Sequence, residues 1–414
     1  MDWKRILLII GFLVLLGGLG YLIYLFFFAA PTPVVPVTNQ PVLNVGFSLG
    51  GPGRPPILSP EVPSEPTRVG LPAIQEGEPD AQLPETASEA HGGPVQTREI
   101  QSDRNLAPIL SSDGVNAVSF DIYDGTFYRI TPDGKQEKLT DQTFVGAEEV
   151  QWSPNAEKAV IGFIDESNII YDFKEKKQFT IPKHWEAFDF SPSGDKIAFK
   201  SLGDSPENRF LVIANGDGTG GRAIEPIGER AGFFDVTWSP SGQVIALVRE
   251  GMDANRQRLF FIGPNKERYT SAVVEGRGIE TQWSSEGNRL LYSGYSASSQ
   301  LKPELWIMNA LGDSIGQNLR KLGVQTWAHK CAFADNTTLY CAVPLELAPG
   351  AGVLPSDGDV GEDHIYKIDL ATGSKVKVAE PQESHTMDQL VISKDQSNLY
   401  FTDKITGKLY SIKL

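Results

Sequence analysis

The chain has 414 residues, of which 41 are Gly and 28 are Pro, and its hydrophobic content of 40% is that of a globular protein. Such an abundance of turn-forming residues favours an all-β architecture. The formal net charge of -15 argues against a nucleic-acid surface, because no cluster of Lys and Arg is available to replace phosphate counterions. The two cysteines, Cys331 and Cys341, are too few for a disulfide-rich scaffold or a four-cysteine zinc site.

An uncharged apolar run occupies residues 6–28. At about 1.5 Å per residue it is long enough to cross a hydrocarbon core of about 30 Å. A cleaved signal peptide would have a shorter apolar region, and Phe28 stands where its first small residue should be. Because Lys4 and Arg5 precede the run, the positive-inside rule predicts a cytoplasmic N-terminus. We therefore expect residues 1–30 to form a short cytoplasmic end and a transmembrane signal-anchor helix.

Residues 31–93 are rich in Pro, Gly, Glu and Ser, and their apolar residues show neither a helix nor a strand period. This composition predicts a disordered tether, which as a flexible coil would span on the order of 45 Å. The tether is either a spacer that holds the following domain off the membrane or a linker without a selected role.

The remainder of the chain, residues 94–414, contains a repeated pattern in which an aromatic residue, Ser, Pro and Gly precede an apolar strand. Four clear copies and three fainter ones have their anchor residues at Trp152, Phe190, Trp238, Trp283, and at Leu110, Phe333 and Ile392. The anchors are separated by roughly 40 to 60 residues, which is the length of a four-stranded propeller blade. We therefore predict a seven-bladed β-propeller, with six or eight blades as the alternatives.

Each repeat has the chemistry of a tight strand reversal. Pro presets φ and Gly accepts a positive φ, so the strand that follows returns antiparallel to the one before. The last repeat has only three strands before the chain ends at Leu414. We predict that residues 95–100, an extended run ahead of the first repeat, supply its fourth strand, because this pairing would join both ends of the domain and remove exposed sheet edges.

The segments Phe190–Phe199 and Trp238–Leu247 resemble the repeat of the TolB-like propellers, a motif often called PD40. Members of that family are commonly six-bladed, whereas this chain has seven copies of the anchor. The resemblance implies a propeller that serves as a protein-interaction module of bacterial envelopes. The motif also occurs in prolyl-oligopeptidase-like enzymes, whose chemistry lies in an added α/β-hydrolase domain for which no residues remain here.

No motif in the sequence predicts catalysis, a cofactor or a metal. The closest approach to a nucleophile elbow, Gly294–Ser298, ends in Ser where Gly is required. The five histidines have no spacing that presents two ligands to one metal ion. The segments 215–221 and 357–363 superficially resemble calcium loops, but neither follows the twelve-residue pattern that ends in Glu. We interpret them as ordinary hairpin and insertion loops, and we expect a protein that is not an enzyme.

Cys331 and Cys341 flank a short turn at residues 335–337. They would lie opposite each other if Ala334 paired with Thr338, which permits a cross-strand disulfide in an oxidising compartment. The alternative is a pair of buried thiols. Either arrangement gives the two cysteines a structural role.

Four charged residues, Glu149, Asp235, Glu280 and Lys330, stand three positions before the anchor of their repeats. Equivalent positions of a propeller form a ring around its axis. Our hypothesis is that these side chains make a polar, mostly acidic rim that binds a cationic group on a partner. The alternative is that they hydrogen-bond neighbouring blades, as buried polar residues must.

Together these features predict a single-pass protein of the cell membrane whose propeller lies outside the cytoplasm and binds an envelope protein or a cell-wall polymer. The alternatives are a propeller that binds carbohydrate or another small ligand, and a hydrolase or lyase that uses the channel mouth. Titratable residues with perturbed pKa values in one funnel would favour these alternatives. A flat face with an exposed aromatic patch would favour protein binding.

Overall fold

The computed structural model describes residue 18 and residues 86–414. The expected membrane anchor, apart from residue 18, and positions 31–85 of the expected tether therefore lie outside the described residues. Within the described part of the chain, no helix has both the length and the apolar character needed to span a bilayer.

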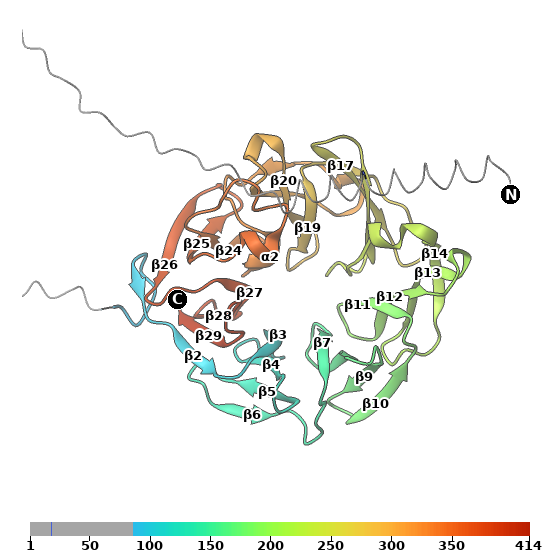
Figure 1. Cartoon of the computed structure of the whole chain (residues 1–414), viewed down its shortest axis with the longest axis horizontal. Helices are drawn as coiled ribbons and strands as arrows, with labels where there is room; N and C mark the ends of the chain where they lie inside the picture. The colour runs from blue at the N-terminus through green and yellow to red at the C-terminus, as the bar shows by residue number, and fades with distance from the viewer. Residues whose placement is uncertain (1–17, 19–85) are drawn as a thin grey trace, which may run out of the picture. The chain divides into compact units, whose positions relative to one another are not determined.

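Seven sheets are arranged radially around a central opening, which makes the domain a seven-bladed β-propeller (Figure 1). We number the blades 1 to 7 in chain order. Their innermost strands are β3 (Asn105–Leu110), β7 (Ala147–Trp152), β11 (Trp185–Phe190), β15 (Phe234–Val236), β19 (Arg277–Trp283), β23 (Cys331–Phe333) and β27 (Met387–Ile392). Every predicted anchor residue except Trp238 falls within one of these strands, and Trp238 follows β15 by two positions.

The other strands follow outward by antiparallel pairing. The second strands are β4 (Ala117–Asp121), β8 (Lys158–Phe163), β12 (Lys196–Leu202), β16 (Ala246–Gly251), β20 (Arg289–Tyr295), β24 (Thr338–Pro344) and β28 (Asn398–Asp403). The third strands are β5 (Thr126–Ile130), β9 (Asn168–Asp172), β13 (Arg209–Asn215), β17 (Arg256–Ile262), β21 (Pro303–Asn309), β25 (Asp363–Asp369) and β29 (Leu409–Lys413). The outermost strands of blades 1 to 6 are β6 (Gln136–Lys138), β10 (Lys177–Ile181), β14 (Arg222–Pro226), β18 (Ala272–Glu275), β22 (Arg320–Lys321) and β26 (Lys375–Pro381).

Short helical turns occupy some of the connections between strands. They are η1 (Pro206–Asn208), η2 (Gly228–Phe233), η3 (Ala297–Ser299), η4 (Gly312–Ser314), η5 (Ala328–Lys330) and α2 (Pro355–Gly358).

The serine of the repeated motif explains why the turn is so regular. In blades 2 and 3 the hydroxyls of Ser153 and Ser191 accept a hydrogen bond from the backbone amide five residues later, at 2.9 and 3.0 Å. In blades 4, 5 and 7 the hydroxyls of Ser239, Ser284 and Ser393 accept the same bond. A side chain that satisfies a turn amide stabilises the reversal locally, so each blade can form its first hairpin from its own sequence.

The hydrophobic core is divided into seven clusters, one at each interface between neighbouring blades. Between blades 1 and 2, for example, Phe127 packs edge-on against Trp152 and Phe144, with ring centroids 5.1 and 5.4 Å apart. Because each blade buries apolar surface on both sides, removal of one blade would expose two clusters. The ring is therefore a single cooperative unit.

The ring is closed by β2 (Arg98–Gln101), which pairs antiparallel with β29 and becomes the fourth strand of blade 7. This is the strand that the sequence placed at residues 95–100, displaced by a few positions. The residues just before it belong to blade 6 instead, because β1 (Pro94–Val95) pairs in parallel with β26.

Contacts of the N-terminal segment begin before residue 94, where the sequence had placed the end of the tether. The Ala90 amide donates to the Lys413 carbonyl at 2.9 Å, and the Gly92 amide donates to the Val378 carbonyl at 2.8 Å. Residues 87–92 thus bridge blades 6 and 7.

A buried histidine ties this closing segment to blade 7. His385 Nε2 lies 3.2 Å from Thr97 Oγ1, and its Nδ1 lies 3.2 Å from Asp403 Oδ2. The ring packs against Phe401 and Tyr410 at centroid distances of 5.2 and 4.4 Å. His385 is only 4% exposed, so its contacts with Thr97 and Asp403 are shielded from water. They therefore help to hold the N-terminal segment on blade 7.

The cysteines of blade 6 face each other across β23 and β24, and the structure joins them in a disulfide. The Ala334 amide donates to the Thr338 carbonyl at 3.0 Å, which is the register that the sequence required for a bridge. Of the two alternatives, bridged cysteines and free thiols, the structure has the first.

The propeller has two faces that differ in their connections. The turns between first and second strands lie on one face, here called the turn face, where the Lys394 amide of blade 7 donates to the Gly114 carbonyl of blade 1. The connections between second and third strands lie on the opposite face, together with the links between blades. We call this the loop face. Its largest insertion, residues 345–362, contains α2 and extends toward the centre of the ring (Figure 1).

Candidate functional site at the channel mouth

Three of the four predicted ring residues lie on innermost strands, in the half of the channel nearer the loop face. Glu149 on β7 is exposed, whereas Asp235 on β15 and Glu280 on β19 are half-buried. The ring is not uniform, because the equivalent residues Ala187 and Gln389 have positive φ, of 53° and 49°, at β-bulges of β11 and β27, whereas the three ring residues do not. A bulge changes the direction in which the following side chains point.

Lys330 does not belong to the exposed ring that the sequence predicted. It lies in η5, ahead of β23, and its side chain is fully buried. Its Nζ donates to Asp359 Oδ1 at 2.5 Å and to Asp363 Oδ2 at 2.7 Å. Lys330 is three positions before its anchor Phe333, as in the other repeats. In blade 6, however, this position belongs to the helical turn η5 and not to a strand, and the side chain points into the protein.

This buried lysine anchors the long insertion of the loop face. Asp359 also accepts a hydrogen bond from Lys404 Nζ at 3.1 Å, which connects the insertion to blade 7. Burial raises the pKa of Asp363 to about 6, against the opposing charge and hydrogen bond of Lys330. Two carboxylates of the segment 357–363, those of Asp359 and Asp363, thus contact the ammonium group of Lys330. Among the described residues, no group of three or more His, Cys, Asp or Glu side chains is placed to hold a metal ion.

His329, which the sequence gave no reason to select, lies beside the predicted ring residue Glu280. Its Nδ1 is 2.7 Å from Glu280 Oε2, and its Nε2 is 3.8 Å from Asp388 Oδ1 of blade 7. Burial disfavours the imidazolium, but the hydrogen bond and charge of Glu280, followed by the charges of Asp388 and Asp359, raise the pKa of His329. His329, which precedes β23 of blade 6, thus connects blades 5 and 7 at the channel through Glu280 and Asp388.

In blade 4, which is next to the blade of Glu280, Asp235 is neutralised within its own blade. Its Oδ2 lies 2.7 Å from Arg249 Nε on the neighbouring strand β16. Burial raises the pKa of Asp235 despite this partner, and burial lowers the pKa of the nearby Lys200. The partner of Asp235 thus lies within its own blade, whereas the alternative given by the sequence was a hydrogen bond to a neighbouring blade.

A further carboxyl group lies deeper, near the turn face. Asp189 Oδ2 accepts the Trp238 amide at 2.6 Å, and Oδ1 accepts the Phe190 amide at 2.9 Å and Gln151 Nε2 at 3.3 Å. These bonds connect blades 2, 3 and 4. Burial raises the pKa of Asp189 to about 6, although all three hydrogen bonds oppose the shift.

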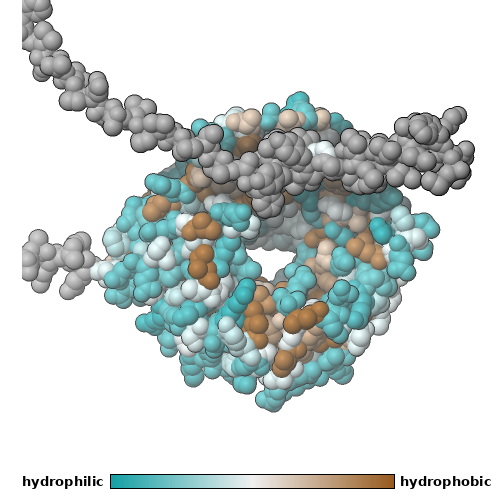
Figure 2. Space-filling model, viewed as in Figure 1, coloured by the Kyte–Doolittle hydropathy of each residue, from teal (hydrophilic) through white to brown (hydrophobic). Residues whose placement is uncertain are grey.

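Large apolar side chains are exposed mainly on the loop face. Blade links and connections between second and third strands carry Tyr123, Val145, Ile164, Phe233, Met252, Leu301, Leu345, Val353, Leu354, Val360 and Ile405. Of the described residues on the turn face, Val115 and Leu311 reach only 37% exposure. Figure 2 shows one face of the ring, on which apolar patches lie between hydrophilic loops around the central opening.

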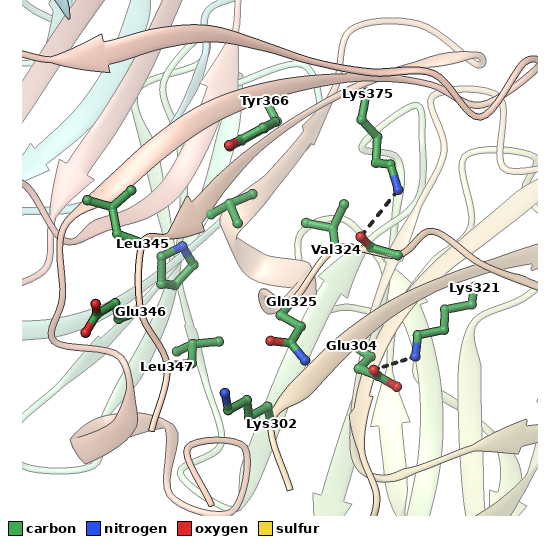
Figure 3. Close-up of a pocket in the computed structure, with 13 residues that line it drawn as sticks. Lys302, Glu304, Lys321, Val324, Gln325, Leu345, Glu346, Leu347, Tyr366 and Lys375 are labelled. Atoms are coloured by element: carbon green, nitrogen blue, oxygen red, sulfur yellow. Dashed lines mark hydrogen bonds and ion pairs between the residues drawn. The ribbon is translucent and has the colours of Figure 1, made fainter. Parts of the chain in front are cut away.

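A separate groove of about 800 Å³ lies along the seam between blades 5 and 6 (Figure 3). Three lysines and two glutamates contribute to its walls, together with Tyr366 and several aliphatic side chains. The sequence repeats did not point to these residues, because they belong to outer strands and irregular connections.

The chain matches no protein-family model and no curated protein sequence. It is similar to the β-propeller domain of Cps50 (Swd1) from Myceliophteria thermophila, with a TM-score of 0.53 and 14% identity over 77% of this chain and 98% of that one. It is also similar to an oligogalacturonate lyase in complex with manganese, with a TM-score of 0.48 and 12% identity over 77% of this chain and 93% of that one. The tricorn protease matches with a TM-score of 0.49 and 12% identity, over 78% of this chain and 34% of that one.

At such identities the likeness establishes the propeller fold alone. The resemblance to the TolB-like family stays a prediction, because no family model matches.

Proposed function

We propose that this protein is a binding module whose loop face receives a partner protein around the channel mouth. The observation that carries the proposal is the unequal distribution of exposed apolar side chains between the two faces. An apolar surface bordered by polar residues is characteristic of protein interaction sites, and propeller loops present such residues on a rigid ring.

The carboxylates of the channel mouth are complementary to a positively charged group on the partner. Glu149 is exposed, and Glu280 and Asp388 lie on either side of His329. A Lys or Arg side chain on the partner would find these acids at the centre of the apolar loops. Charge complementarity of this kind increases the association rate and selects among partners.

The proposed location is the outer side of a cell membrane, with an envelope protein as the partner and a cell-wall polymer as the alternative. The uncharged run at residues 6–28 and the lysine and arginine before it support an anchored, outward orientation. The disulfide between Cys331 and Cys341 supports an oxidising compartment. The proposed activity is binding without catalysis.

The test is a cross-linking pull-down with the full chain in its native membrane. The loop-face variant combines Val145→Asp, Ile164→Asp and Ile405→Asp, whose parent side chains are 78%, 68% and 67% exposed. The matched control is Val376→Asp, 56% exposed on the outermost strand of blade 6. Surface changes of this kind alter folding stability by about 0.5 kcal/mol or less, so all variants should fold.

The expected result is a specific partner that the loop-face variant loses and the Val376→Asp control retains. A partner bound equally by both variants would contradict the proposal. A second variant, Glu149→Gln with Glu280→Gln and Asp388→Asn, should bind more weakly, with the largest difference at low ionic strength.

A further inference from the structure

The groove of Figure 3 exists because the outer strand of blade 5 is unusually short. β22 contains only Arg320 and Lys321, whereas the outer strand of blade 6, β26, spans seven residues. The missing strand length leaves a space of about 800 Å³ between the two blades. This volume is within the range of small-molecule sites, roughly 300 to 1,000 Å³.

The groove differs in charge from the rest of a strongly acidic chain. Lys321 Nζ bonds to Glu304 Oε1 at 2.5 Å, so these two charges neutralise each other. Lys375 Nζ donates to the Leu322 carbonyl at 3.0 Å, which leaves its positive charge uncompensated by that bond.

Lys302 is the group best placed to receive a ligand. Within the described part of the chain, its Nζ makes no hydrogen bond or ion pair that would neutralise it. In Figure 3 the side chains of Lys302 and Gln325 point into the open space of the groove. The Gln325 amide adds a hydrogen-bonding group that carries no charge.

The remaining walls suit the body of a small molecule. Tyr366 supplies an aromatic ring, while Val324, Val343 and Leu347 supply aliphatic surface. Rings of sugars or apolar side chains of a peptide can pack on such surfaces while their polar groups bond at the edge.

We propose that this groove binds a small ligand with one carboxylate, held by Lys302 and Gln325 with its body against Tyr366. The site is separate from the channel mouth, so the inference does not depend on the loop-face partner. A carboxylate fits better than a phosphate monoester, because Glu346 also lines the groove and would repel the second negative charge. An acidic sugar and the C-terminus of a peptide share this chemistry.

The test measures binding to the full chain in detergent by isothermal titration calorimetry. One pair of probes is N-acetyl-trialanine and its C-terminal amide, and the other is a glucuronate-containing disaccharide and its methyl ester. Inorganic phosphate is the fifth probe. We expect at least one carboxylate to bind about ten-fold more tightly than its neutral counterpart, and the pair that does so identifies the source of the ligand.

Variants assign the binding to the groove. Lys302→Met should weaken carboxylate binding by about five-fold or more. The control Lys174→Met, a lysine with a 69% exposed side chain on the turn face, should leave binding unchanged. Bound ligand should also slow acetylation of Lys302 by an amine-reactive reagent, measured by mass spectrometry, without slowing that of Lys174.

The proposal would be overturned if no carboxylate probe bound better than its neutral counterpart, or if Lys302→Met bound as well as the parent. Tighter binding of phosphate than of either carboxylate would also overturn it. The pull-down substitutions at Val145, Ile164 and Ile405 lie outside the groove, so failure here would leave that experiment unaffected.

Discussion

The two faces of the ring are built by different rules. On the turn face the same serine hydroxyl closes the hairpin of blade after blade, and neighbouring turns touch each other. On the loop face the connections range from residues 122–125 to the insertion 345–362, which long-range ion pairs hold in place. Local chemistry thus specifies the face that is nearly invariant from blade to blade, and tertiary contacts specify the face that varies.

The largest expected effect comes from removing the buried lysine of the loop face. Lys330→Met leaves Asp359 and Asp363 without their main cation, and loss of one partner from a buried ion pair costs about 3–5 kcal/mol. Urea denaturation should show this loss, and limited proteolysis should show new cleavage within residues 345–362.

The matched control for this experiment is Lys174→Met on the turn face. Lys174 lies 3.9 Å from Glu157 in an exposed pair, so its removal should cost less than about 1 kcal/mol. Equal losses of stability in the two variants would mean that the insertion does not depend on the buried pair. Addition of Asp363→Asn to Lys330→Met should restore part of the stability.

A smaller effect should appear in the pH dependence of stability through Asp189. Its pKa of about 6 in the folded protein exceeds the value of about 3.9 expected in the unfolded chain. The folded state therefore binds the proton more strongly, and stability should fall as the pH rises from about 4 to about 6, by on the order of 3 kcal/mol. Asp189→Asn should remove this part of the slope.

The measurement is the urea midpoint of both proteins at several pH values between about 4 and 7. Asp363 also has a pKa raised to about 6 and adds its own slope, so the difference between parent and variant is the quantity to compare. Identical slopes in the two proteins would show that Asp189 does not titrate in this range.

The smallest effect tests the contact between neighbouring turns. Gly287 and Gly242 both have positive φ, at 69° and 76°, so alanine strains the backbone at either position. A Cβ at Gly287 would also lie 2.4 Å from the Ser241 amide nitrogen of blade 4, whereas no atom lies within 4 Å at Gly242. Gly287→Ala should therefore lower stability by about 1–2 kcal/mol more than Gly242→Ala. Equal melting temperatures would argue against close packing of the turns.

The propeller was predictable because its information is local and repeated. Anchor residues such as Trp152 and Phe190 recur with the length of a blade, and the incomplete last repeat indicated that an N-terminal strand closes the ring. The site was less predictable, because counting positions from the anchor assumes that every blade enters its first strand in the same way. The helical turn at Lys330 and the bulge at Gln389 break that assumption.

Other parts of the site carry no repeat signal at all. His329 joins carboxylates from two other blades, and Lys302 faces a space created by a short strand elsewhere in the chain. Both arrangements depend on residues far apart in sequence. Neither composition nor periodicity reports such distances.

The closure by β2 also affects when the ring can fold during synthesis. Its partner β29 follows it by roughly 310 residues in the chain, and at about 5–20 residues per second the delay between the synthesis of the two strands is on the order of tens of seconds. Throughout that interval β2 has no strand to pair with. The ring can therefore close only after β29 has been synthesised, and until then the unpaired strand edges of the nascent chain need protection from pairing with other strands.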